Sequence, residues 1–169
     1  MDIIQNMLYG FQVALQPINL IYCFFGVLIG TLVGVLPGLG PAAAIALLLP
    51  STFKATPVSA IIMLAGIYYG AQYGGSTTSI LVNIPGEASS VVTCIDGYQM
   101  ALRGRAGPAL GISAFGSFIA GTFAVIALTF IGPLLAGIAL QFGPPEFFSL
   151  MIVGIMVLTF LSSGSMIKA

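Results

Sequence analysis

Residues 18–41 read INLIYCFFGVLIGTLVGVLPGLGP, and this stretch decides the fold. Its first part is apolar and uncharged, whereas Pro37–Pro41 packs two prolines and two glycines into five residues. Proline removes a backbone donor and clashes with the preceding turn, and glycine favours non-helical conformations, so a helical ladder ends here. The sequence therefore predicts an apolar helix that breaks at Pro37–Pro41.

The composition requires a bilayer as solvent. Hydrophobic residues make up 59% of the chain and charged residues 5%, whereas a soluble domain is about 25% charged. The uncharged intervals from Asp2 to Lys54, from Lys54 to Glu87 and from Arg105 to Glu146 each exceed the ~20 residues of a membrane helix. We predict an all-α polytopic membrane protein whose surroundings are the lipid bilayer.

Apolar periodicity and breakers divide the chain into two parts. Residues 1–16 have apolar side chains at helical spacing and are predicted to form an amphipathic helix in the membrane interface. Residues 17–169 form the predicted membrane domain, with a turn region at Pro133–Pro145. Its segments are a broken-helix hairpin at 18–50, a helix with a Gly/Ser/Thr loop at 56–86, an amphipathic helix at 87–102, and spans at 106–131 and 147–161.

Basic residues suggest an orientation. If 18–50 is a re-entrant hairpin and the N-terminus is cytoplasmic, all four basic residues fall on the cytoplasmic side, as the positive-inside rule favours. In the alternative, 18–36 crosses fully and the later segments invert relative to Lys54. We prefer the hairpin, which places together Lys54, Arg103, Arg105 and Lys168.

Glycines recur at every fourth position in two apolar segments. This spacing gives a helix one smooth face, against which another helix backbone can pack closely. The predicted packing positions are Gly26, Gly30, Gly34, Gly66, Gly70 and Gly74.

The helix break is also the predicted site. A broken helix aims free N–H groups and free carbonyls at one point, which suits an anion and a cation. Open polar backbone, expected at Gly74–Asn83, survives in a membrane where protein or a wet cavity surrounds it. Predicted substrate- and ion-binding residues are Pro37, Gly38, Gly40, Ser76, Thr77, Thr78, Ser79, Asn83 and Pro85, with a sodium site near Gly38, Gly40 and Asn83. For the hydroxyls, simple hydrogen bonding to neighbouring helices is an open alternative.

Other chemistries find little support in the sequence. There is no histidine, no P-loop and no net charge, so we expect no enzyme, no cofactor and no nucleic-acid partner. The loose dinucleotide pattern at 38–43 follows a membrane helix instead of a strand. Energy for transport would come from an ion gradient or another subunit. For Glu87 and Asp96 we expect structural or gating ion pairs with Arg103 or Arg105.

Two stretches resemble a known family. Residues 30–41 (GTLVGVLPGLGP) and 69–87 (YGAQYGGSTTSILVNIPGE) resemble signatures of the large membrane subunit of tripartite tricarboxylate transporters. The similarity continues through Asp96-Gly97-Tyr98 and Gly104-Arg105-Ala106-Gly107, and it runs over essentially the whole chain.

The resemblance implies a secondary transporter of the bacterial inner membrane. Such a system uses a periplasmic solute-binding protein and a small membrane subunit, and takes up citrate or other carboxylates with sodium or protons. The family subunit is longer, and its second half repeats the break, so this chain would be one half of an inverted-repeat transporter. A truncated inactive fragment, a non-transporting membrane interaction subunit and a glycine-lined channel are the alternatives.

Overall fold

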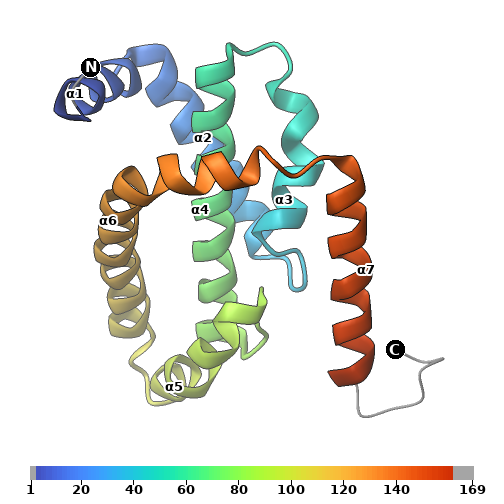
Figure 1. Ribbon diagram of the computed structural model, residues 1–169. Helices are drawn as coiled ribbons and strands as arrows, with labels where there is room; N and C mark the ends of the chain where they lie inside the picture. Colours follow the sequence, from blue (N-terminus) through green and yellow to red (C-terminus); the bar gives the residue numbers. More distant parts are fainter. Residues whose placement is uncertain (1–2, 162–169) are drawn as a thin grey trace. The chain divides into compact units, whose positions relative to one another are not determined.

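The computed structural model describes residues 3–161, so Lys168 lies outside the described residues. These residues form helices and connecting turns, with no strand among them. The elements are α1 (Ile3–Ala14), α2 (Pro17–Gly34), α3 (Pro41–Leu48), the 3-10 turn η1 (Leu49–Thr52), α4 (Pro57–Val82), η2 (Ala88–Ser90), α5 (Val91–Leu102), α6 (Ala106–Ala139) and α7 (Pro144–Leu161) (Figure 1). Chain contacts define two compact units, residues 1–118 and 119–169.

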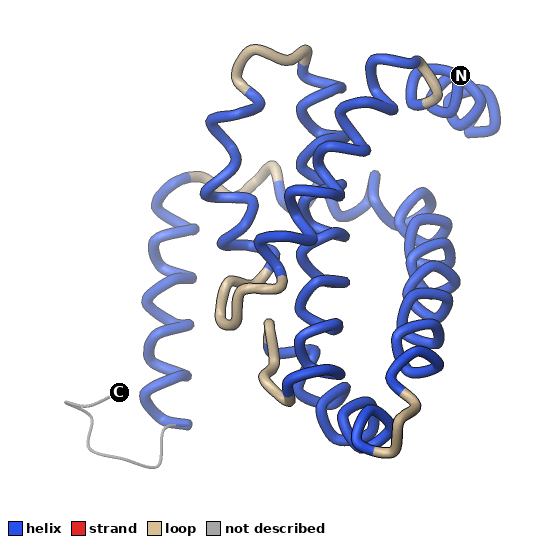
Figure 2. Tube along the Cα trace, turned by 180° about the vertical axis from the view of Figure 1, so that it is seen from behind, coloured by secondary structure: helices blue, strands red, loops and turns tan. Residues whose placement is uncertain are grey.

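Helices α2 and α4 lie side by side and run in the same direction (Figures 1 and 2). Gly26 approaches the backbone of Met63, and Gly30 approaches that of Ile67. A methyl group on Gly30 would collide with the carbonyl oxygen of Ile67. Because residue numbers rise together along both helices, the packing is parallel, and a connection must return the chain between them.

That connection is the hairpin made by α3 and η1. The chain reverses after α2, and the buried Ser59 hydroxyl donates to Asn19 Oδ1 at 2.6 Å. This bond ties the start of α4 to the start of α2. Asn19 Nδ2 also donates to the Val13 carbonyl at 2.8 Å, so the buried amide is satisfied on both sides. Residues 18–50 thus start and finish at the same end of the α2–α4 helix pair.

The predicted Gly74–Asn83 loop is wrong: α4 continues as a helix through Val82. The hydroxyls of Thr77 and Ser79 donate to carbonyls four residues earlier, at 3.0 and 2.8 Å, and the Thr78 hydroxyl lies 3.1 Å from the carbonyl oxygen of Gly74. Such bonds satisfy polar side chains within the helix, and they let a Gly/Ser/Thr-rich sequence remain helical in an apolar setting.

The predicted turn at Pro133–Pro145 is also wrong in its extent. Pro133 lies inside α6, which ends at Ala139, and α7 begins at Pro144. Proline removes one backbone hydrogen bond, to the carbonyl of Thr129, and membrane helices tolerate this loss. In the second unit no described side chain is buried from 119 to 157, which suits helices whose apolar faces contact lipid.

The all-α membrane class is confirmed. By length and composition, α2 (18 residues) and α6 (34 residues) are long and apolar enough to cross a bilayer. A 26-residue α4 is also about 39 Å long, although glycines and hydroxyls lower its mean hydropathy.

The predicted common side for Lys54, Arg103 and Arg105 needs residues 87–102 to return along α4, and α5 does not make this return. α5 packs on the far end of α4, where Gly97 meets Ile80. With 12 residues, α5 is about 18 Å long, so it cannot return along the roughly 39 Å of α4 to Lys54. Lys54 and the two arginines therefore lie at opposite ends of α4, and a cytoplasmic N-terminus no longer follows from the charges.

We expect Gly30→Ala to lower stability by about 1–3 kcal/mol, because the added methyl group overpacks the α2–α4 contact. Gly10→Ala is the matched control, since a Cβ there meets nothing within 4 Å. Thermal unfolding in detergent, followed by circular dichroism, measures both. Equal melting temperatures for the two variants would contradict the close packing.

We expect Lys54→Cys and Arg105→Cys to react with a membrane-impermeant maleimide from opposite sides of the membrane. The background would carry Cys23→Ala and Cys94→Ala, which removes the two native thiols. Labelling of sealed vesicles of known orientation is the measurement. If both positions react from the same side, α4 does not span the bilayer.

Candidate functional site

Four segments meet where α2 ends. They are the end of α2, the break at 35–40, the second half of α4, and the turn at 83–87, and Figure 2 shows the break and the turn as neighbouring loops. We call this meeting point the junction, and its glycines are Gly34, Gly40, Gly74, Gly75 and Gly86. The sequence predicts that the break and the Gly74–Pro85 segment converge near the membrane midplane. The break and the turn at 83–87 lie close together, and their depth in the bilayer stays a prediction.

Backbone contacts hold the junction together. A Cβ on Gly74 would lie 2.9 Å from the backbone of Gly34 and Val35, and a Cβ on Gly86 would lie 3.2 Å from the Gly34 carbonyl oxygen. Gly75 and Gly86 also touch through their Cα atoms. A larger residue at Gly74 would separate α4 from α2, and one at Gly86 would separate the turn from α4.

One side chain bridges the junction. The buried Thr78 hydroxyl donates to the Val35 carbonyl at 3.0 Å, which is one of the carbonyls left open at the end of α2. The same hydroxyl lies 3.1 Å from its own-helix acceptor, the Gly74 carbonyl. Thr78 thus joins the start of the break to α4.

Two left-handed residues shape the loops. Gly38 has φ +83°, and no atom lies within 4 Å of the position a Cβ would take, so the tip of the break is open. Asn83 ends α4 with φ 60° and ψ 29°, a conformation that asparagine tolerates better than other non-glycine residues. Both residues are exposed at the surface of the described chain.

The predicted site residues divide by burial. Pro37, Gly38, Asn83 and Pro85 are exposed; Gly40, Ser76 and Thr77 are half-buried; Thr78 and Ser79 are buried. The hydroxyls of Thr77 and Ser79 are engaged with their own helix, which matches the alternative of structural hydrogen bonding. The predicted site residues that are exposed at the junction therefore lie in the break and in the turn that starts at Asn83.

The helix ends at the junction have opposite polarity. Helix α3 starts at Pro41 after the extended Gly40, so its first free N–H groups face the break side. Helix α4 ends at Val82, leaving its last carbonyls without helical partners. Free N–H groups attract anions and free carbonyls attract cations. Among the described residues no cluster of three His, Cys, Asp or Glu side chains is placed to hold a metal ion.

The expected ion pairs of Glu87 and Asp96 with Arg103 or Arg105 are wrong for the described chain. Glu87 caps η2: its carboxylate accepts from the Ser90 backbone and, at 2.6 Å, from the Ser89 hydroxyl. Glu87 also packs at the junction, where its Cβ is 3.6 Å from a Cβ built on Gly40.

Sequence reasoning missed Gly75 and Gly86 as contact positions. Both stand outside the four-residue glycine spacing that identified the packing face, and Gly86 follows a proline in what reads as an ordinary turn. The contact joins residues from a helix and a turn, so no single-helix period reveals it.

The fold and the junction define a helical membrane protein with a broken-helix hairpin packed against a glycine-rich helix. The family model described as the tripartite tricarboxylate transporter TctA family matches residues 20–169. The chain belongs to this family, which is a family of transporters and not of enzymes, and the predicted resemblance is confirmed.

A curated relative supports the assignment. The chain is 60% identical over 169 residues, its full length, to an uncharacterised 52.8 kDa protein from the TAR-I ttuC′ 3′ region of Agrobacterium vitis. The chain spans 34% of that relative's length. No solved structure matches the chain.

We expect Thr78→Val to lower the free energy of unfolding by about 1 kcal/mol or more, because it leaves the Val35 carbonyl without its donor. Thr78→Ser keeps the hydroxyl and should retain most of the stability. Thr77→Val is the control, since Thr77 donates to its own helix alone. The measurement is the melting temperature in detergent, and equal losses for Thr77→Val and Thr78→Val would contradict a bridging role.

Proposed function

We propose that this chain is the N-terminal part of a permease subunit that takes up citrate-like tricarboxylates or related carboxylates together with a cation. Membership of the transporter family supports the class. The proposed binding site rests on one observation, the junction. There the start of α3 and the end of α4 lie beside the same break. Gly38, Gly40 and Asn83 are the proposed contact residues there.

The assembly follows from the family. A periplasmic solute-binding protein would deliver the carboxylate, and a small membrane subunit would complete the complex in the bacterial inner membrane. Because the chain spans 34% of its relative, the remaining part of a longer subunit would supply the opposite half of the site. The coupling ion would be sodium or a proton.

The depth of the site in the bilayer is a separate part of the proposal. Helix α2 has 18 residues and is about 27 Å long, close to the ~30 Å hydrocarbon thickness. If α2 stands upright from one interface, its end lies near the other interface. A midplane site would require α2 to tilt strongly or to start outside the hydrocarbon region.

The competing function is a non-transporting membrane interaction subunit, or a truncated inactive fragment. The glycine contacts between α2 and α4 would serve such a subunit equally well. This alternative predicts that changes at exposed junction residues leave transport of the complex unchanged, whereas changes at Gly30 disturb assembly. Saturable, gradient-dependent uptake would exclude a glycine-lined channel.

We expect Asn83→Gly to reduce uptake of radiolabelled citrate by about tenfold or more. A factor of ten corresponds to a free-energy difference of about 1.4 kcal/mol. Glycine accepts the left-handed conformation of Asn83, so this variant removes the amide group and keeps the turn. The assay uses proteoliposomes containing the complete gene product and both partner proteins, under imposed sodium or proton gradients.

Two further variants distinguish loss of the Asn83 amide from strain in the turn and from a general effect of changing an exposed residue there. Asn83→Ala removes the amide and also strains the turn, so it should reduce uptake at least as much as Asn83→Gly. Ile84→Ala changes an exposed neighbour and should leave uptake near the wild-type level. Full uptake by Asn83→Gly would remove the amide from the site, and full uptake by both Asn83 variants would favour the interaction-subunit alternative.

A further inference from the structure

One long face of α4 has no partner in the described chain. Helices α2 and α3 pack on other faces of α4 (Figure 1), and the contacts with α2 run along its glycines, among them Gly70. At 3.6 residues per turn, Gln72 lies roughly opposite Gly70 around the helix. A stripe through Gln72 continues at spacings of three or four residues, and we call it the open face: Ile61, Ala65, Tyr69, Gln72 and Ser76.

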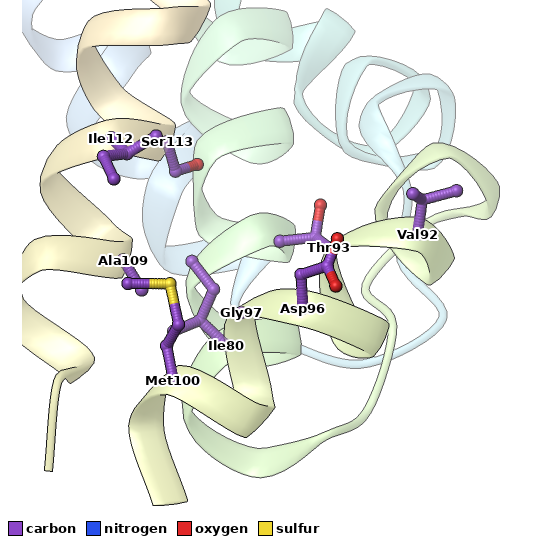
Figure 3. Close-up of a pocket in the computed structure, with 9 residues that line it drawn as sticks. All are labelled: Ile80, Val92, Thr93, Asp96, Gly97, Met100, Ala109, Ile112 and Ser113. Atoms are coloured by element: carbon purple, nitrogen blue, oxygen red, sulfur yellow. The ribbon is translucent and has the colours of Figure 1, made fainter. Parts of the chain in front are cut away.

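The open face is bounded at one end by α5. Ile80, four residues beyond Ser76, is 1% exposed, and a Cβ on Gly97 of α5 would lie 2.7 Å from its Cγ1. Figure 3 shows Gly97 beside Ile80 at this end of α4. From Ile61 to Ser76 the open face is about 22 Å long, at about 1.5 Å per residue. One further helix can lie along this length.

The first half of the open face borders an apolar groove. The groove has a volume of about 340 Å³, and its walls are Ile45 of α3 with Ile61, Leu64, Ala65, Tyr68 and Tyr69 of α4. Lipid acyl chains and apolar side chains fill such a groove equally well. The groove by itself therefore does not identify what covers the open face.

The second half of the open face is polar. Gln72 and Ser76 are half-buried, and Tyr69 is 49% exposed. These three side chains make no hydrogen bond or ion pair within the described chain, whereas Thr77 and Ser79 donate to their own helix. Along the axis of the 26-residue α4, Gln72 lies about 4 Å from the midpoint. A spanning α4 holds this amide at the depth of the lipid tails, where it needs protein or water as a partner.

The described part of the second unit does not offer these partners. The side chains of Thr129, Gln141 and Ser149 donate to carbonyls four residues earlier, and the Glu146 carboxylate accepts from the Gly143 backbone. The relative that matches the full length of this chain is about three times as long, because the chain spans 34% of it. The remaining part of such a subunit would supply further helices.

We propose that the open face of α4 is the surface on which the remaining part of the longer subunit packs, through one helix. That helix places apolar side chains along the groove at Ile61 and uncharged hydrogen-bonding side chains opposite Gln72 and Ser76, because an amide and a hydroxyl each donate and accept. As an interior helix, α4 can be less apolar than α2 and α6, as it is. The inference rests on the proposed function in one respect, that this chain is part of a longer subunit.

The test is the environment of a nitroxide spin label on the open face, in the complete gene product with its native cysteines replaced. A single molecule in each lipid nanodisc, without partner proteins, excludes a second copy and the small membrane subunit. Labels at Gln72→Cys and Ser76→Cys should collide with oxygen, which concentrates in lipid, about threefold less often than a label at Phe123→Cys, since close packing excludes small molecules. Both labels should also be shielded from a water-soluble nickel complex.

Phe123 is the matched control, because it is 69% exposed and lies near the midpoint of the apolar 34-residue helix α6. Ser76→Cys is nearly isosteric, so it gives the result even where Gln72→Cys does not fold. Oxygen access equal to that of the control would show lipid at the open face, and access of the nickel complex would show a water-filled cavity. Either outcome, or shielding that appears only when the small membrane subunit is added, would overturn the proposal.

Spin-label shielding and citrate uptake separate the two proposals. Shielded labels without any carboxylate uptake would overturn the proposed transport and leave the packing surface in place. Uptake together with labels that are open to oxygen or to the nickel complex would overturn the packing surface and leave the proposed transport in place.

Discussion

The contact between glycines of α2 and carbonyls of α4 is the interaction on which the described structure depends. Gly26, Gly30 and Gly34 each meet a backbone carbonyl of α4, and Gly66, Gly70 and Gly74 meet the backbone of α2 in return. In lipid there is little hydrophobic drive between helices, so close backbone approach supplies dispersion contacts instead. Because the two helices run parallel, the chain must return between them, and α3 with η1 provides that return.

This packing also positions the junction, where the site is proposed. The glycine contacts continue beyond Gly34 to the crossing of Gly75 with Gly86, so the break and the turn after α4 are held together by backbone contact. Thr78 adds the hydrogen bond to Val35 at the point where α2 ends. An ion or carboxylate site built from helix ends needs those ends held in position, since free N–H and C=O groups act over short distances.

Polar residues in this chain follow two patterns. Most hydroxyls satisfy themselves within their own helix, as Thr77 and Ser79 do, and they carry no sign of ligand binding. Asp96 and Thr93 on α5 instead make no hydrogen bond within the described chain, and the Asp96 side chain is exposed.

The sequence by itself determined the all-helical membrane class, the break at Pro37–Pro41 and the glycine faces, because these depend on composition, helix-breaking residues and a four-residue period. The transporter family followed from the same stretches. The tertiary structure decided what local patterns leave open: α4 stays helical through Val82, since its hydroxyls bond within the helix, and Pro133 sits inside α6. It also decided that α5 stays at the far end of α4 and that Asp96 lies free of both arginines. These outcomes depend on which helices pack together and how far each one reaches, and no period within a single segment contains that information.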